Sequence, residues 1–245
     1  MKSRLCIFLV LLFLIPVFAC APTSPLPQPR RVVDPSQVHN AIKTPEWDIA
    51  AIKYEYSGQG LDYSKADLEP VFLVFKNIGQ STPKVLEEEM RGVGTDGDYL
   101  PYSTDEAVRL AFASETFKQT AKNALKSGGL GAALGGGLGA IITMFTGDNV
   151  LVGAGMGAAV GGAAFAAGSL PEAEAKLERN IKQELVQYAW KSTPIPPSYT
   201  RMGYVYLPAN KGIDRMSITV RSGQRLETYV LPLLDSPEDM GKTGK

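Results

Sequence analysis

Short runs of alternating or continuous apolar residues near both ends of the chain predict β-strands. Ile52, Tyr54 and Tyr56 alternate with polar residues, which is typical of a strand with one buried face. Residues 71–75 are apolar throughout and predict a strand that is central or buried on both faces. Strand patterns return at residues 204–207, 216–220 and 226–231. Six or seven short strands with this alternation predict a small antiparallel β-sandwich.

The middle of the chain changes from a strand period to a helical one. A turn-rich segment at 94–102 leads into Ser103 and Glu106, whose spacing predicts a capping box that starts a helix. Two amphipathic helical segments are expected, over 104–126 and 171–190. Their apolar stripes consist of Leu110, Phe117, Ala121 and Leu125 in the first segment and Leu177, Ile181, Leu185 and Tyr188 in the second.

Between these segments, residues 127–169 are small or apolar and Asp148 is the only charge. Gly147, Asp148 and Asn149 predict a turn that divides the stretch into two arms. Glycines recur every four residues in both arms, so on a helix each set lines one face and allows another backbone to approach closely. They are Gly131, Gly135 and Gly139 before the turn and Gly153, Gly157 and Gly161 after it.

The surroundings decide whether this glycine-rich stretch is helical. In water each glycine costs up to about 1 kcal/mol relative to alanine, whereas in lipid an unsatisfied backbone group costs several kcal/mol, so a bilayer enforces the helix. An arm of about 18 apolar residues rises roughly 27 Å, close to the hydrocarbon thickness of a thin bilayer. We therefore expect a membrane-inserting hairpin; a tightly packed helix pair that never meets lipid is the alternative.

The N-terminus has the pattern of an export signal. Lys2 and Arg4 precede an apolar run over residues 5–18, which is typical of a secretory signal peptide. The sequence VFAC at 17–20 resembles the lipobox of bacterial lipoproteins. That resemblance implies that Cys20 becomes the lipid-modified first residue of the mature chain. An ordinary signal peptide cleaved near position 21 is the alternative.

Charge and cysteine content agree with this interpretation. Removal of residues 1–19 would take away two of the 25 basic residues and none of the 25 acidic ones, which leaves a net charge of about −2 and argues against a nucleic-acid partner. Cys6 would leave with the signal, so Cys20 would be the only remaining thiol and no disulfide could form within the chain. Ala21 stands where aspartate would resemble an inner-membrane retention signal, and by this family analogy the outer membrane, facing the periplasm, is favoured.

Residues 128–168 also resemble the glycine-zipper domains of bacterial lipoproteins, including the TraT surface-exclusion lipoproteins. Hairpins of this composition insert in the outer membrane in that family and assemble into rings. The resemblance is confined to the hairpin and implies lipid as a partner and self-association through the glycine faces. A weaker resemblance, carried by PVFLVFKNIGQ and DGDYLPYS, is to immunoglobulin-like lipoprotein domains.

Candidate chemistry is sparse. The lone His39 lies in a proline-rich segment and is predicted to be solvated. Gly153, Gly155 and Ala158 match a variant dinucleotide-binding pattern, but the long preceding strand and the later acidic residue of that fold are missing. The consecutive glutamates at 87–89 could hold a cation, but their spacing favours a solvated face. We expect no enzymatic activity, no cofactor and no metal.

Together these patterns predict an α+β protein, in which a small immunoglobulin-like antiparallel β-sandwich is interrupted by a long antiparallel helical hairpin. We expect a non-enzymatic envelope lipoprotein that self-associates as a structural, ring-forming or pore-forming assembly. The alternative is a periplasmic scaffold or binding lipoprotein whose hairpin docks on a partner protein. The predicted parts are a signal peptide (1–19), a lipidated proline-rich tether (20–44), two sandwich halves (45–103 and 191–234), the hairpin (104–190) with its tip (128–168), and a disordered tail (235–245).

Overall fold

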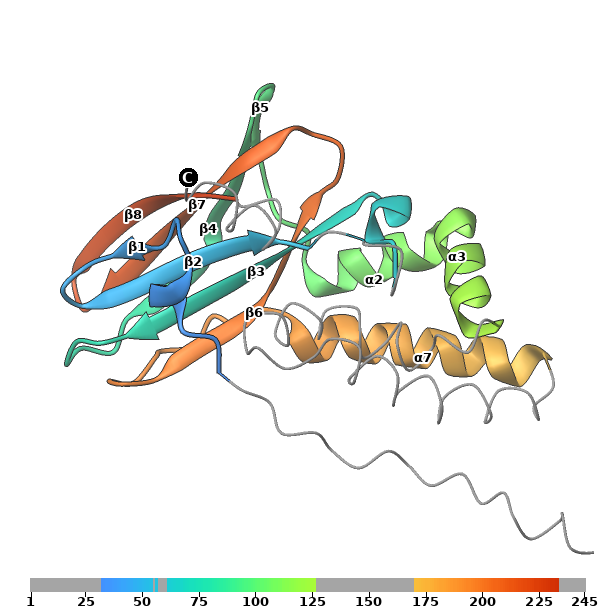
Figure 1. Ribbon diagram of the computed structural model, residues 1–245, viewed down its shortest axis with the longest axis horizontal. Coiled ribbons are helices and arrows are strands. Elements are labelled where there is room, and N and C mark those ends of the chain that lie inside the picture. The colour runs from blue at the N-terminus through green and yellow to red at the C-terminus, as the bar shows by residue number, and fades with distance from the viewer. Residues whose placement is uncertain (1–31, 55, 57–60, 127–169, 234–245) are drawn as a thin grey trace, which may run out of the picture.

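Two four-stranded antiparallel sheets form the larger part of the computed structural model, which describes residues 32–54, 56, 61–126 and 170–233 (Figure 1). Sheet A has the strand order β1-β2-β3-β6 and sheet B the order β5-β4-β7-β8. The strands of sheet A are β1 (Ile42–Lys43), β2 (Trp47–Lys53), β3 (Leu68–Asn77) and β6 (Thr200–Pro208). Those of sheet B are β4 (Lys84–Gly94), β5 (Gly97–Tyr99), β7 (Ile213–Ser222) and β8 (Arg225–Pro232).

The two sheets share one apolar core, so the predicted α+β class with a sandwich-like pair of antiparallel sheets is confirmed. Val71, Leu73 and Phe75 on β3 pack in the same cluster as Met216 and Ile218 on β7. Each sheet combines strands from both ends of the chain, because β6 pairs with β3 and β7 pairs with β4. The helical region therefore interrupts the sandwich in sequence, as expected.

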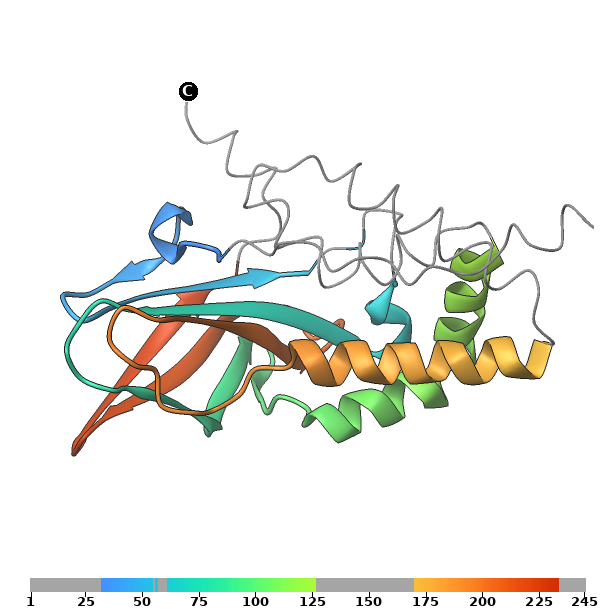
Figure 2. The same cartoon turned by 90° about the horizontal axis from the view of Figure 1, so that it is seen from below.

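A second apolar core lies between the outer face of sheet A and three helices. These are α2 (Thr104–Ala113), α3 (Glu115–Lys126) and α7 (Leu170–Tyr188); α7 runs alongside α2, whereas α3 lies across α7 (Figures 1 and 2). Phe72 and Val74 on β3 belong to this core, together with Phe117 of α3 and Ile181 of α7. The expectation that the helices project from the edge of the sandwich is wrong for their described parts. They pack on sheet A because β3 is apolar on both faces.

The strand predicted around residue 52 lies earlier in the chain and is more deeply buried than expected. β2 begins at Trp47 and ends at Lys53, and Tyr54 and Tyr56 follow it. Ile49 and Ala51 face sheet B, whereas Ala50 and Ile52 face the helices. The alternating pattern suggested one solvent-facing side because it does not reveal the helical cover.

The predicted tether is too long, since the chain joins the fold before residue 44. Val33 and Val38 are buried on either side of a 3₁₀ helix, η2 (Pro35–Gln37). Asp34 caps η2 by accepting a hydrogen bond from the Ser36 N–H, and it also binds Lys76 Nζ of β3 at 2.8 Å. Aspartate followed by proline is an N-terminal helix signal that the proline-rich composition hid.

The first predicted helix is divided at Ser114. The capping box of Ser103 and Glu106 starts α2 as predicted, but Ser114 has an extended backbone (φ −83°, ψ 109°). Its hydroxyl accepts a hydrogen bond from the Phe117 N–H at 3.1 Å and donates one to the Lys65 carbonyl. A serine that bonds neighbouring backbone groups favours a helix start over a helix interior, so 104–126 forms α2 and α3 instead of one straight arm.

The side chain of Asn77 ties the end of β3 to two loops, and this arrangement generates a stability prediction. Asn77 is fully buried; its Nδ2 donates to the carbonyls of Ser81 and Ile195 at 2.7 and 2.9 Å, and its Oδ1 accepts from the Gly79 N–H at 3.0 Å. Asn77→Ala should lower the free energy of unfolding by about 3 kcal/mol in urea denaturation, because these three partners lose their bonds.

Asn123→Ala is the matched control, because the exposed Asn123 side chain of α3 bonds only Gln119 among the described residues. This change should shift the free energy of unfolding by less than about 0.5 kcal/mol. Equal effects of the two substitutions would contradict the role assigned to Asn77.

Candidate functional site

The candidate functional site is the helical base, defined as α2, α3 and α7, from which the glycine-rich segment departs. The described chain stops at Lys126 at the end of α3 and resumes at Leu170 at the start of α7. Both points lie at the same end of the molecule, on the right of Figures 1 and 2, away from the sheets.

The residues predicted to carry the function lie outside the described part of the chain. They are the lipidation residue Cys20, the packing glycines Gly131, Gly135, Gly139, Gly153, Gly157 and Gly161, and the turn residues Gly147, Asp148 and Asn149. The signal peptide (1–19) and the predicted tail (235–245) lie outside it as well. What the structure describes is the part of the fold from which residues 127–169 depart and to which they return.

Apolar stripes hold the helical base on sheet A. Leu177, Ile181 and Leu185 of α7 are buried, as are Phe117 and Ala121 of α3. These residues belong to the stripes predicted from helical spacing, which are confirmed at these five positions. The buried faces of α3 and α7 therefore pack both helices against sheet A.

A row of aromatic rings extends this packing. The Phe117 ring lies 5.7 Å from the ring of Tyr63, and Tyr63 lies 5.6 Å from Tyr54 in an edge-on arrangement. On the sheet, Phe72 and Tyr204 pack with ring centroids 5.0 Å apart. Ring pairs at these separations add to the stability that apolar burial provides.

One carboxylate, Glu184, is buried within this apolar layer. Its exposed fraction is 4%, and it lies three residues after Ile181 and seven after Leu177 on α7, on the same stripe. The nearby phenols include Tyr206, whose hydroxyl donates to the Leu185 carbonyl at 2.8 Å, and Tyr54, whose hydroxyl donates to the Leu61 carbonyl at 3.1 Å. Burial of Glu184 was not predicted from the sequence, although its spacing from Leu177 places it on the apolar stripe of α7.

Burial controls the ionisation of the tyrosines in this layer. It raises the pKa of Tyr63 and Tyr204 well above 10, and it raises the pKa of Tyr54 and Tyr206 too. The negative charge of Glu184 acts in the same direction on all four. The phenols of these four tyrosines therefore stay neutral at neutral pH.

The end of α7 is joined tightly to β6. The Trp190 N–H donates to the Tyr204 carbonyl at 2.8 Å, and Ala189 forms a bridge with Tyr204. A Cβ atom at Gly203 would lie 2.6 Å from the Trp190 Cα, so only glycine permits this approach. Tyr188 packs in the helical core and Trp190 in the sandwich core, so these two residues connect the two cores at the junction.

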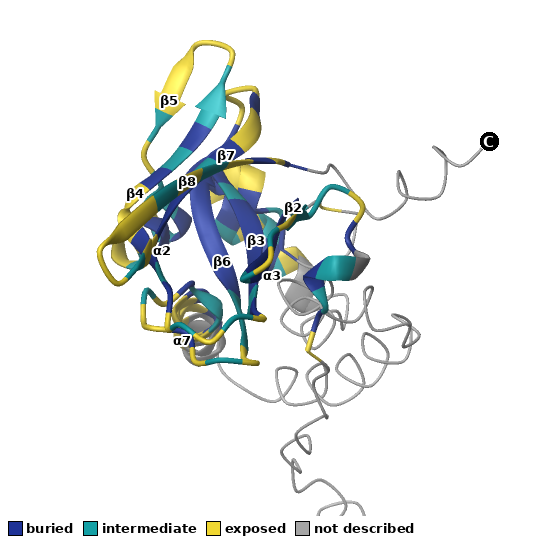
Figure 3. Cartoon of the chain, turned by 90° about the vertical axis from the view of Figure 1, so that its left-hand side faces the viewer, coloured by how far each residue is buried: buried dark blue, intermediate teal, exposed yellow. Residues whose placement is uncertain are grey.

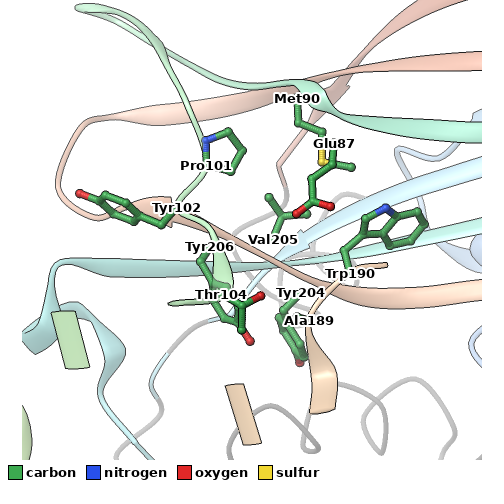
Figure 4. A pocket seen from close by; sticks show the side chains of 10 residues that line it. All are labelled: Glu87, Met90, Pro101, Tyr102, Thr104, Ala189, Trp190, Tyr204, Val205 and Tyr206. Atoms are coloured by element: carbon green, nitrogen blue, oxygen red, sulfur yellow. The ribbon is translucent and has the colours of Figure 1, made fainter. Parts of the chain in front are cut away.

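A small hollow lies beside this junction. Figure 4 shows Glu87, Met90, Val205 and Trp190 among the residues that line it. Its volume of about 20 Å³ holds no more than one water molecule, so it is too small for an organic substrate. Burial, with the neighbouring charge of Glu88, raises the pKa of Glu87.

The three consecutive glutamates form part of a bulge in β4. Leu86 pairs with Thr219 and Arg91 with Ser217, so four residues of β4 stand opposite one residue of β7. All three glutamates are exposed, as the sequence predicted, although Glu87 is partly covered where it lines the hollow. Among the described residues no group of three His, Cys, Asp or Glu side chains is arranged to bind a metal ion.

Comparisons with known proteins identify no family for this chain. A scan of protein-family models found no match, and searches of the curated proteins and of the solved structures found none either. In the part of the chain that the structure describes, no helix combines the length and the apolar character that crossing a bilayer requires.

The tyrosine hydroxyls of the helical base generate a matched pair of substitutions. Tyr206→Phe should lower the free energy of unfolding by about 1 to 2 kcal/mol, because it removes a buried hydrogen bond to α7. Tyr63→Phe should change it by less than about 0.5 kcal/mol or increase it, because the buried Tyr63 Oη has no hydrogen-bond partner among the described residues. Urea denaturation measures the free energy of unfolding of both variants. A larger decrease for Tyr63→Phe than for Tyr206→Phe would contradict the hydrogen bonding assigned to the two hydroxyls.

The raised tyrosine pKa values predict instability at high pH. Below about pH 10 these phenols are neutral in both the folded and the unfolded chain, so they add no pH dependence. Above it they ionise in the unfolded chain first, so the free energy of unfolding should fall as the pH rises. Tyrosinate absorbance of the buried phenols should appear in one step with the loss of ellipticity; ionisation in a fully folded protein would contradict the burial.

Proposed function

We propose that this chain is a non-enzymatic lipoprotein of the bacterial envelope, exported by residues 1–19 and anchored through Cys20. Residues 127–169, carried by α3 and α7, form an antiparallel glycine-zipper hairpin that inserts in the outer membrane from the periplasmic side. Copies self-associate through the glycine faces in a structural, ring-forming or pore-forming assembly. The immunoglobulin-like sandwich and the helical base form the platform that carries the hairpin.

One observation carries the proposal: α3 ends and α7 begins at the same end of the molecule (Figure 1). A segment that leaves and returns at one place can cross part or all of a bilayer and come back. Residues 127–169 contain one charge, Asp148, near their middle, and burying it in lipid costs about 3 kcal/mol on insertion scales. The cost of burying Asp148 is offset because lipid around the glycine-rich arms enforces their helical hydrogen bonds.

The helical base supports the proposal mechanically. A hairpin in a membrane exerts force on the chain at Lys126 and Leu170, and both helices that receive it are packed on sheet A through Phe117 and Ile181. The close contact of Trp190 with Gly203 prevents α7 from sliding along β6. The platform and the hairpin thus move together.

Membrane attachment without the lipid tests the insertion. The mature chain with Cys20→Ser, exported by a cleavable signal, should stay in the outer-membrane fraction after a carbonate wash, because the hairpin holds it there. Release into the soluble fraction would refute insertion and favour the scaffold alternative, in which the hairpin docks on a partner protein.

In the same form of the protein, Gly135→Leu with Gly157→Leu should reduce the oligomer size in detergent, because leucine fills the grooves between helices. Ala133→Leu with Ala159→Leu is the matched control, since it places leucine on the opposite helix face, with one carbon less added at each position, and should leave the oligomer intact. An unchanged oligomer in the glycine variant would refute assembly through the glycine faces.

A further inference from the structure

The last strand of sheet B is an uncovered edge. β8 pairs with β7 on one side and ends the sheet on the other within the described structure. In Figure 3, β8 crosses the molecule on the side that faces the viewer, and no described segment lies in front of it. An edge strand of eight residues presents unpaired backbone groups that can accept another strand.

Large apolar side chains are exposed on the outer face of this strand. Leu226 is 60% exposed and Val230 is 48% exposed, and Thr228 lies between them on the same face. Leu231 and Tyr229 alternate with them and pack toward the sandwich core. Two exposed aliphatic side chains four residues apart on a sheet edge favour a further strand that covers them.

The β7–β8 turn determines which backbone groups of β8 point outward. Gly223 (φ 60°) and Gln224 form a two-residue turn between the paired residues Ser222 and Arg225. Residues flanking such a turn form a hydrogen-bonded pair, and the pattern alternates along the ladder. The N–H and C=O groups of Leu226, Thr228 and Val230 therefore point to the open edge.

The side chains agree with this assignment. Thr228 stands opposite Thr219 of β7, and their hydroxyl oxygens are 3.0 Å apart. In antiparallel ladders, side chains lie closer together in pairs that do not exchange backbone hydrogen bonds. Thr219 and Thr228 are expected to form a pair of this type, and the short distance between their hydroxyls agrees. The backbone groups of Thr228 are thus available to a neighbouring strand.

We propose that β8 pairs with β8 of a second copy of this chain, antiparallel and centred on Thr228. In this register Thr228 stands opposite Thr228 of the partner copy, and Leu226 stands opposite Val230. Six backbone hydrogen bonds form, and the exposed aliphatic side chains of each copy cover those of the other. The two B sheets join into one sheet of eight strands.

Charge and proline select this register among its neighbours. A shift that centres the pair on Glu227 would bring two carboxylates directly opposite each other, which is unfavourable. A shift the other way, centred on Tyr229, sets Leu226 opposite Pro232, which has no N–H to donate. Only the register centred on Thr228 pairs aliphatic with aliphatic side chains and uses every outward N–H group.

Segments of the same chain fit the edge poorly. Residues 21–31 contain four prolines, and residues 234–245 are mostly polar with a proline and two glycines, so neither has the alternating apolar pattern of an added strand. Residues 127–169 leave the described fold from the helical end, away from β8 (Figure 1). A second copy supplies a strand that matches in length and in side-chain pattern.

Cysteine cross-linking of the full mature chain tests the register. In a Cys20→Ser background the introduced cysteine is the only thiol, because Cys6 lies in the predicted signal peptide. Under mild oxidation Thr228→Cys should form a disulfide-linked dimer at least about tenfold faster than Leu226→Cys, since two residues at position 226 lie roughly 13 Å apart in this register. A mixture of the Leu226→Cys and Val230→Cys chains should cross-link to a heterodimer.

Charge substitution gives a second measurement. Val230→Lys should abolish the Thr228→Cys cross-link, and adding Leu226→Glu should restore it, because the introduced ammonium and carboxylate stand opposite each other across the two copies. Circular dichroism checks that each variant folds. Equal cross-linking at positions 226 and 228, or no rescue in the double variant, would overturn the proposal.

This contact requires neither lipid nor the glycine-rich segment, so it goes beyond the proposed function and can fail separately from it. The Thr228→Cys dimer should persist in the Gly135→Leu and Gly157→Leu background. If that dimer is lost there, the β8 contact depends on the hairpin and this inference is wrong, whatever the outcome of the membrane test.

Discussion

Sheet A has to be covered on both faces, because β3 carries large apolar side chains at every position from 71 to 75. Sheet B covers one face and the helical base covers the other. An antiparallel sheet with one face in water would leave Phe72 and Val74 exposed. The position of α2, α3 and α7, and with it the point where the glycine-rich segment leaves the fold, follows from this requirement.

The layer of helices that covers sheet A also contains buried polar groups. Glu184 is buried in it, near tyrosines whose pKa its charge raises. Tyr206, on β6, donates a hydrogen bond from its hydroxyl to the backbone of α7. Polar contacts inside an apolar layer restrict how the layer can pack, which gives α7 a defined orientation on the sheet.

Much of this arrangement could be predicted from local sequence pattern. The strands with clear alternation, the capping box at Ser103 and the apolar stripes of α3 and α7 depend on neighbouring residues alone. Three features could not be predicted in this way: the helical cover of β2, the break at Ser114 and the burial of Val33. Each depends on a contact with a distant segment, such as the Lys65 carbonyl that accepts a hydrogen bond from Ser114. Glu184 was missed because a single charge on an apolar stripe is ordinarily solvated.

The pairing of distant strands has a consequence for the order of folding. β3 requires β6, and β4 requires β7, across sequence separations of well over a hundred residues. Contacts of such long range form slowly because the intervening chain loses entropy when they close. Neither sheet can be completed until its C-terminal strands, β6 in sheet A and β7 and β8 in sheet B, are available, so completion of the sandwich waits for the last segment of the chain to be synthesised.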